Sequence, residues 1–207
     1  MRDHRDSGAA GDVTRPGPSR AAAPVVIALA AAVAFGAVDQ YLGSLYSPFL
    51  TAVSGMSAPW LLLPFIVGAC QPNRRRAVVL GLAVSWLAVG AYVLMIVSPM
   101  EGVHTTVREI AFTAATQWLW FLGGLVSGPL YGLLGHYWRA RRSWPVALLA
   151  ALPVMLEPAA RWFATREGLT SWSSFPPADF AEVLTGLALT IVVTVAIARA
   201  RTAGRAA

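Results

Sequence analysis

The sequence contains no lysine, a single cysteine and few charged residues of either sign. Of its 207 residues, 13% are charged and 57% are hydrophobic, whereas soluble domains carry roughly 25% charged residues. A water-soluble fold of this size could not cover its exterior with so few charges. The composition therefore excludes an ordinary soluble domain and predicts an integral membrane protein.

The scarcity of cysteine and histidine excludes several kinds of site. Cys70 stands alone, so an intrachain disulfide or a cysteine-based zinc site cannot form. His4, His104 and His136 are too scattered for a metal site. Phosphate-binding loops, dinucleotide-binding glycine motifs, HExxH and GxSxG are also missing. We therefore expect no metal, no cofactor and no enzymatic activity, and an intramembrane enzyme is the weakest alternative.

All sixteen basic residues are arginines, and the formal net charge is +6. This charge could indicate nucleic-acid binding, but the arginines cluster between apolar runs rather than along one face. Arginines in short loops set the topology of membrane proteins, because cytoplasmic loops carry the excess of positive charge. We therefore expect no nucleic-acid partner.

Long apolar runs separate the arginine clusters and predict an all-α fold, a polytopic helical membrane bundle in the lipid bilayer. We expect one domain over residues 21–198 with six transmembrane helices, at about 21–44, 56–70, 77–97, 110–136, 144–162 and 180–198. Polar residues 1–20 are expected to form a disordered cytoplasmic tail, and 199–207 a second cytoplasmic tail. The charged start of the chain also resembles a signal peptide, but the length of the first run favours an uncleaved helix.

The distribution of arginines predicts the orientation. With the N-terminus inside, thirteen of the sixteen arginines are cytoplasmic, and only Arg108, Arg161 and Arg166 lie outside. The positive-inside rule thus predicts that both termini are cytoplasmic in a bacterial plasma membrane. The uncharged segment 45–55, interrupted by Pro48, then lies outside and is expected to form a short interfacial helix.

Small residues recur every four positions in two predicted spans. They are Ala28, Ala32 and Gly36 in the first span, and Gly124, Gly128 and Gly132 in the fourth. A helix face without large side chains lets a neighbouring helix approach closely. We therefore expect the first helix to pack against the glycine face of the fourth.

Polar side chains inside the spans are the candidates for a ligand site, because a carboxylate in hydrocarbon costs about 2.5–3.5 kcal/mol on insertion scales. At a rise of 1.5 Å per residue, the two acids of the first and fifth spans both lie toward the outer surface. The candidate pocket contains carboxylates, amides, aromatic residues and an arginine: Asp39, Gln40, Gln117, Trp118, Trp120, Glu157 and Arg161. These residues converge only if their helices are neighbours.

Two interpretations of these polar residues stay open. In the structural one, Glu157 pairs with Arg161 at i, i+4 spacing and Asp39 caps the end of its helix. In the functional one, they form an outward-opening pocket for a small polar or cationic ligand, or a proton-coupled site. Pro153 and Pro158 favour a broken helix around Glu157, as found at transporter sites.

Four segments carry a family resemblance: 57–69 (SAPWLLLPFIVGA), 89–95 (VGAYVLM), 123–139 (GGLVSGPLYGLLGHYWR) and 156–158 (LEP). They resemble an uncharacterised family of small integral membrane proteins from high-GC Gram-positive bacteria, known only as a domain of unknown function. The resemblance covers most of residues 25–198 and implies no activity.

A looser likeness is to the substrate-binding subunits of energy-coupling-factor vitamin transporters. Those subunits also have about six helices, bind ligand near the outer face and dock a partner through small residues of their first helix. The small residues of the first span here match in type, whereas the vitamin-binding motifs are not recognisable. The likeness implies a ligand site at the outer face and a membrane partner subunit.

Two hypotheses for the function follow. In the first, the protein binds or helps to transport a small molecule through an outward-facing polar pocket. In the second, it is a structural or scaffolding protein whose glycine faces associate with a second copy or with a membrane partner.

Overall fold

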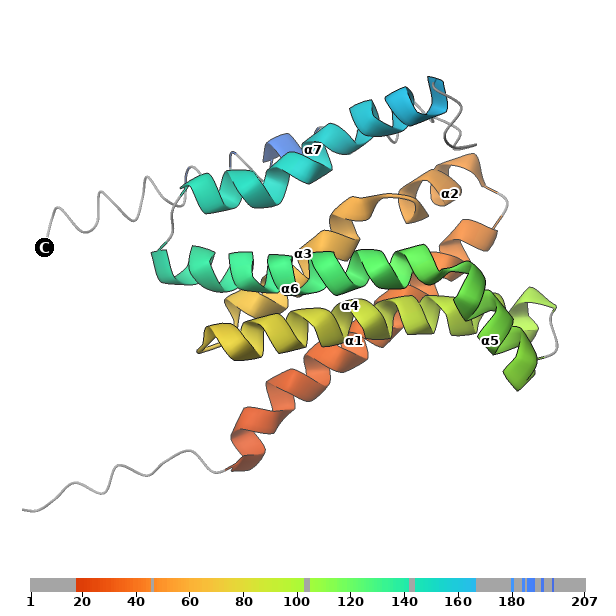
Figure 1. The fold of residues 1–207 in the computed structure, drawn as a ribbon, viewed down its shortest axis with the longest axis horizontal. Coiled ribbons are helices and arrows are strands. Elements are labelled where there is room, and N and C mark those ends of the chain that lie inside the picture. Colours follow the sequence, from red (N-terminus) through yellow and green to blue (C-terminus); the bar gives the residue numbers. More distant parts are fainter. Residues whose placement is uncertain are drawn as a thin grey trace, which may run out of the picture.

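The computed structural model describes residues 18–45, 47–102, 105–141 and 144–166, together with residues 180, 184, 186–188, 191 and 195. In this part of the chain all regular structure is helical (Figure 1). The helices are α1 (Pro18–Ser44), α2 (Pro48–Ser54), α3 (Ser57–Ala69), α4 (Arg74–Ile96), η1 (Pro99–Glu101), α5 (Val107–Thr116), α6 (Trp118–Arg141) and α7 (Trp144–Arg166). The predicted all-α class is confirmed, and so is a short helix, α2, within segment 45–55.

Three helices are long and apolar enough to cross a membrane. They comprise Ala23–Ser44, Arg74–Ile96 and Trp118–Arg141, with 22, 23 and 24 residues. At 1.5 Å per residue each is at least as long as the ~30 Å hydrocarbon core. Three such helices indicate a multi-pass membrane protein.

The other predicted spans differ from the structure in length or position. α3 has only 13 residues, or about 20 Å, and is too short to cross the core alone. α7 contains the fifth predicted span, but its strongly apolar part is limited to Leu148–Ala160. The sixth span, 180–198, lies outside the described residues apart from single positions, as do residues 1–17 and 199–207. α1 begins at Pro18, inside the predicted tail.

The prediction of one helix over 110–136 was wrong. A capping box formed by Thr106 and Glu109 starts α5 at Val107, and α5 ends before Gln117. At that end, the Thr113 carbonyl oxygen accepts the Gln117 N–H at 2.9 Å and the Thr116 hydroxyl at 2.8 Å. Side-chain bonds of this kind compete with helix continuation. The membrane helix α6 therefore begins only at Trp118.

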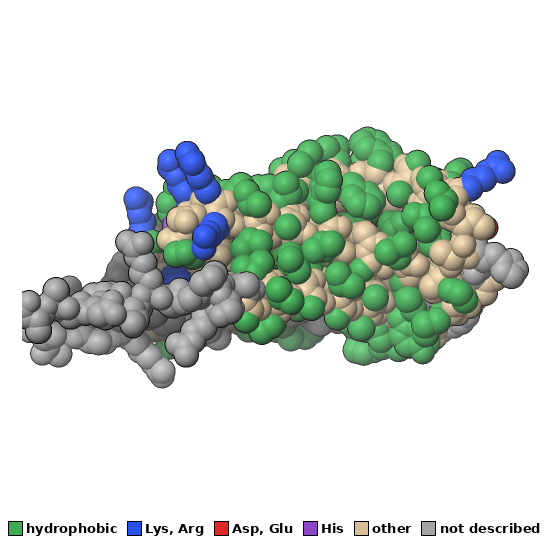
Figure 2. Space-filling model, turned by 90° about the horizontal axis from the view of Figure 1, so that it is seen from below, with side chains coloured by type: hydrophobic (Ala, Val, Ile, Leu, Met, Phe, Trp, Pro, Cys, Tyr) green, Lys and Arg blue, Asp and Glu red, His purple; other side chains and the backbone are tan. Residues whose placement is uncertain are grey.

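Large apolar side chains face outward, and small ones fill the interior. The central cluster consists of Ala32, Val67, Val84 and Ala88. Many leucines, valines and aromatic residues on the outside are more than 40% exposed. Figure 2 shows this apolar surface along the body, with most of the visible basic side chains at one end. Monomeric soluble proteins rarely expose so large an apolar surface, whereas lipid covers it in a membrane.

We call the end that holds Arg74–Arg76 and Arg139–Arg141 the arginine end of the bundle. α1 and α7 run from this end to the opposite end, where α2, η1 and α5 lie (Figure 1). α3 runs back toward the arginine end, α4 leaves it, and α6 returns to it. The helices are thus antiparallel to their neighbours in sequence, as short connections require.

Small residues bring α4 and α6 into direct backbone contact. A Cβ atom added at Gly128 would lie 2.7 Å from the Gly81 carbonyl oxygen, and one at Gly132 would overlap the Ala77 carbonyl oxygen. We call this contact, formed by Ala77, Gly81, Ser85, Gly124, Gly128 and Gly132, the glycine seam. Gly132 also meets Gly68 of α3, so α6 packs closely against two helices.

The expected contact between the first helix and the glycine face of α6 was wrong, because α4 lies between them. α1 packs on α4 instead, where a Cβ atom at Gly36 would overlap the Ala88 carbonyl oxygen. Ala32 is fully buried and Ala28 partly buried at the same contact. α4 carries small residues toward both neighbours and is the centre of the bundle.

The glycine seam predicts that Gly132→Ala destabilises the protein, because the added methyl group forces α4 and α6 apart. Overpacking of this kind costs typically 1–3 kcal/mol. We expect the unfolding free energy in detergent micelles, measured by denaturant titration, to fall by about that amount. Gly123→Ala is the matched control, since nothing lies within 4 Å of a Cβ atom there. Equal effects of the two variants would contradict the seam.

Candidate ligand site

Asp39 is a buried carboxylate near the end of α1 opposite the arginine end. It is 7% exposed and lies five residues before Ser44, the last residue of α1. The indole N–H of Trp60, from α3, donates to its carboxylate, and Tyr92 of α4 is close enough to interact with its charge. The acid therefore points into the bundle, between three helices.

Three aromatic rings pack against one another on the side of the bundle where Asp39 lies. The Phe35 and Trp60 ring centroids are 5.0 Å apart at an interplanar angle of 71°, and those of Trp60 and Tyr92 are 6.0 Å apart at 72°. Edge-to-face contacts of this kind fix the ring orientations. Phe35 lies one turn before Asp39 on α1. We call Phe35, Asp39, Trp60 and Tyr92 the Asp39 cluster.

Glu157 of α7 binds the start of α3. Its Oε2 atom accepts the Ser57 backbone N–H at 3.2 Å and also the Ser57 hydroxyl. The first N–H groups of a helix have no partner within the helix, and the helix dipole favours an anion there. Glu157 thus supplies a negatively charged acceptor from a position 100 residues away in sequence.

The first turn of α3 connects the two acids. Ser57 contacts Glu157, and Trp60, three residues later on the same helix, contacts Asp39. Residues at i and i+3 lie on one side of a helix. The structure therefore brings the two predicted carboxylates to a single helical turn, although each has its own partner there.

Comparison with known proteins identifies the family of this chain. The model of a family of unknown function, DUF6518, matches residues 15–207. The chain belongs to this family. No curated protein and no solved structure matches it. The resemblance to an uncharacterised family is thereby confirmed for this DUF6518 chain.

The remaining predicted site residues lie elsewhere. Gln40 is half-buried on α1, and Gln117 occupies the turn between α5 and α6. Trp118 and Trp120 are each 56% exposed at the start of α6, as expected for interfacial aromatic residues. Among the described residues, no hydrogen bond or ring contact joins these tryptophans to the Asp39 cluster. The Arg161 side chain lies outside the described part of the chain.

The predicted helix break around Glu157 was wrong. α7 runs from Trp144 to Arg166 with both Pro153 and Pro158 inside it. Proline is tolerated in membrane helices because neighbouring groups and local adjustments satisfy the freed backbone atoms. The α7 backbone therefore offers no broken-helix site of the kind seen in transporters.

Ser57, Trp60, Tyr92 and Phe35 were not predicted as site residues. Phe35 and Asp39 share an i, i+4 spacing, which is a detectable signal on one helix. Ser57 and Trp60 stand in the SAPW segment that opens a very short apolar helix, where free N–H groups require acceptors. Tyr92 carries no local signal, because only the packing of α4 on α1 and α3 brings it near.

The Glu157–Ser57 contact predicts that the two residues are energetically coupled. Glu157→Ala is expected to lower the unfolding free energy by about 1.5–3 kcal/mol, the value of a hydrogen bond to a charged group. The loss should shrink when Ser57 is already alanine, giving a coupling energy of about 0.5 kcal/mol or more in a double-mutant cycle.

Ser54 provides the matched control for this cycle. Its hydroxyl donates to the Thr51 carbonyl oxygen within α2 and does not bind Glu157. The Ser54→Ala and Glu157→Ala effects should therefore add. Additive effects of Ser57→Ala and Glu157→Ala would show that the contact contributes nothing.

Proposed function

We propose that the protein is a non-enzymatic, multi-pass protein of the bacterial plasma membrane that binds, and helps to move, a small positively charged molecule at the Asp39 cluster. We also propose six spans with both termini cytoplasmic. The arginines at one end of the apolar body support this orientation (Figure 2), since cytoplasmic loops hold the excess positive charge. The Asp39 cluster then lies near the outer surface.

The burial of Asp39 among aromatic rings is the observation that supports a cationic ligand. Among the described residues, the hydrogen-bond donor to Asp39 is the Trp60 indole, which is neutral and supplies no positive charge. A carboxylate in hydrocarbon is costly and needs a counter-charge or water. Rings attract cations within about 6 Å of their faces. A ligand cation would supply the counter-charge that Asp39 needs and would also be attracted to the neighbouring aromatic rings.

The simpler interpretation, that Asp39 caps its own helix, has less support. Asp39 lies more than one turn before the end of α1, and its side chain is directed at α3 rather than at its own backbone. An acid near a helix C-terminus is also disfavoured by the helix dipole. Glu157, in contrast, has a structural role at Ser57, so we place the ligand at Asp39 alone.

The alternative function, scaffolding through glycine faces, is less favoured because those faces pack within the chain. Gly128 and Gly132 meet α4 and α3 of the same molecule. Ala32 and Gly36 meet α4 in the same way, so docking of a transporter partner on that face would require α1 to leave α4. An assembly partner would need to use the outward apolar surface instead.

The proposal predicts that Asp39→Asn abolishes cation binding while the protein still folds. The detergent-solubilised protein would be titrated with tetraphenylphosphonium and with tetraethylammonium in equilibrium dialysis. We expect wild type to bind one or both, and Asp39→Asn to bind at least about tenfold more weakly, equivalent to ~1.4 kcal/mol. Asparagine keeps an acceptor for the Trp60 indole, so abundance and melting temperature should stay close to wild type.

A pair of tryptophan variants separates ligand binding from general aromatic packing. Trp60→Phe removes the indole N–H that donates to Asp39, whereas Trp86→Phe removes one that donates to the Phe121 carbonyl oxygen at 3.1 Å. Only Trp60→Phe should change cation affinity. Binding that is unchanged in Asp39→Asn, or an Asp39→Asn variant that loses only abundance, would refute the proposal.

A further inference from the structure

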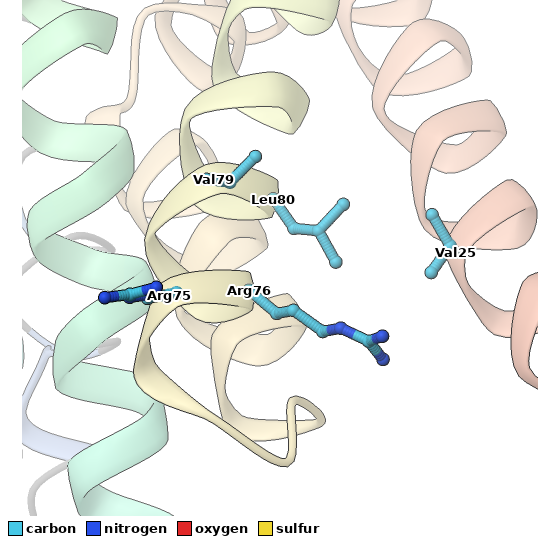
Figure 3. Close-up of a pocket in the computed structure, with 5 residues that line it drawn as sticks. All are labelled: Val25, Arg75, Arg76, Val79 and Leu80. Atoms are coloured by element: carbon cyan, nitrogen blue, oxygen red, sulfur yellow. The ribbon is translucent and has the colours of Figure 1, made fainter.

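A groove opens between α1 and α4 at the arginine end of the bundle (Figure 3). It has a volume of about 320 Å³ and is lined by Val25, Arg75, Arg76, Val79 and Leu80. Its wall is almost entirely apolar, and the arginines lie at its rim, in the first turn of α4. We call it the α1–α4 groove.

The groove exists because α1 and α4 pack along their middle parts, from Ala28 to Gly36 on α1, and then diverge. Their closest approach is at Gly36 and Ala88, near the middle of α4. From there α1 slants away from α4 toward the arginine end (Figure 1). Leu29 still packs against the core cluster, but Val25, one turn earlier, is too short to reach across. Val25 and Leu80 therefore face each other over open space (Figure 3).

In the part of the chain that the structure describes, no acidic side chain pairs with the arginines at the rim of the groove. Three arginines form the first turn of α4, and that turn contains no acidic residue. The sequence has no aspartate or glutamate between Asp39 and Glu101. The free N–H groups and the dipole of the helix start add positive potential at the same place. Arg76 extends from α4 toward α1, below Leu80 (Figure 3).

We propose that the α1–α4 groove binds an anionic phospholipid. The phosphate would lie on the Arg76 guanidinium, which can bind phosphate oxygens in a bidentate manner. One acyl chain would run along Val25, Val79 and Leu80. Leu80 is one helical turn, or about 6 Å, further along α4 than Arg76, so headgroup and chain meet their partners at the depths a bilayer lipid requires.

The lining distinguishes a lipid from a soluble anion. A free phosphate ester would use the arginines and leave the apolar wall empty, and water would then fill an apolar groove at a free-energy cost. A bilayer lipid uses both features. Basic pockets between membrane helices on the cytoplasmic side are a general mode of anionic headgroup recognition.

The first test compares lipids by native mass spectrometry of the full-length protein in detergent. Dioleoyl phosphatidylglycerol and dioleoyl phosphatidylcholine are added separately at equal concentration. We expect phosphatidylglycerol adducts to exceed phosphatidylcholine adducts several-fold. Arg76→Gln should lower the phosphatidylglycerol adducts about fivefold, the effect of one arginine at an anionic surface. Arg74→Gln, the same charge change outside the groove lining, should leave them near the wild-type level.

The second test fills the groove without changing charge. Val25→Trp should lower phosphatidylglycerol retention, whereas Val26→Trp should not, because Val26 is 62% exposed and lies outside the lining. Glycerol phosphate, which has the headgroup chemistry without acyl chains, should fail to displace the lipid.

Four outcomes would overturn the proposal. Equal retention of the two lipids would remove the charge selectivity, and equal losses in Arg74→Gln and Arg76→Gln would show a diffuse charge effect. Full retention in Val25→Trp would place the chain elsewhere. Displacement by glycerol phosphate would identify a soluble-anion site.

Discussion

The shortness of α3 is the constraint on which the rest of the bundle depends. A 13-residue helix is about 20 Å long, so its free N–H and C=O groups do not both reach the bilayer surfaces. Backbone groups in hydrocarbon must be satisfied from within the protein. Glu157 does so at the start of α3, and at its end Arg139 donates to the Ala69 carbonyl oxygen at 3.3 Å. The His136 Nδ1 atom lies 3.1 Å from the Gln71 carbonyl oxygen, just beyond the C-cap residue Cys70. Each end thus receives the charge that its dipole favours.

The small residues of α4 make this arrangement possible. Because Gly81 and Gly128 let α4 and α6 touch through their backbones, α6 lies close enough to reach both α4 and α3. Dispersion contacts and packing, rather than the hydrophobic effect, hold helices together in lipid, and small residues maximise them. The same feature leaves large side chains on the outside, where lipid covers them. The groove between α1 and α4 shows the reverse case, since these helices diverge toward the arginine end and leave an opening for lipid there.

The individual apolar helices could be predicted from the sequence, because length and hydropathy are local properties. The glycine repeat of α6 could likewise be recognised as a packing face. The helix that packs on it could not be predicted, since the small residues of α4 that contact it are not unusual for a membrane helix. Glu157 accepts hydrogen bonds from Ser57, 100 residues earlier in the sequence, and local spacing does not predict this contact. At the end of α5 before Gln117, the Thr116 hydroxyl bonds to the Thr113 carbonyl oxygen of its own helix, a local contact that hydropathy does not reveal. Local pattern thus predicts elements and faces, whereas partners depend on packing between distant segments.

The two ends of α3 have a consequence for how the protein is made. Ribosomes deliver the chain from its N-terminus, so α3 enters the membrane before α6 and α7 exist. A nascent chain that ends at Ile96 holds a short helix whose terminal amides have neither Glu157 nor Arg139 to bind. The contacts at the two ends of α3 can form only after α6 and α7 have been synthesised. The backbone groups at both ends of α3 thus depend on residues that the ribosome delivers later, from the C-terminal half of the chain.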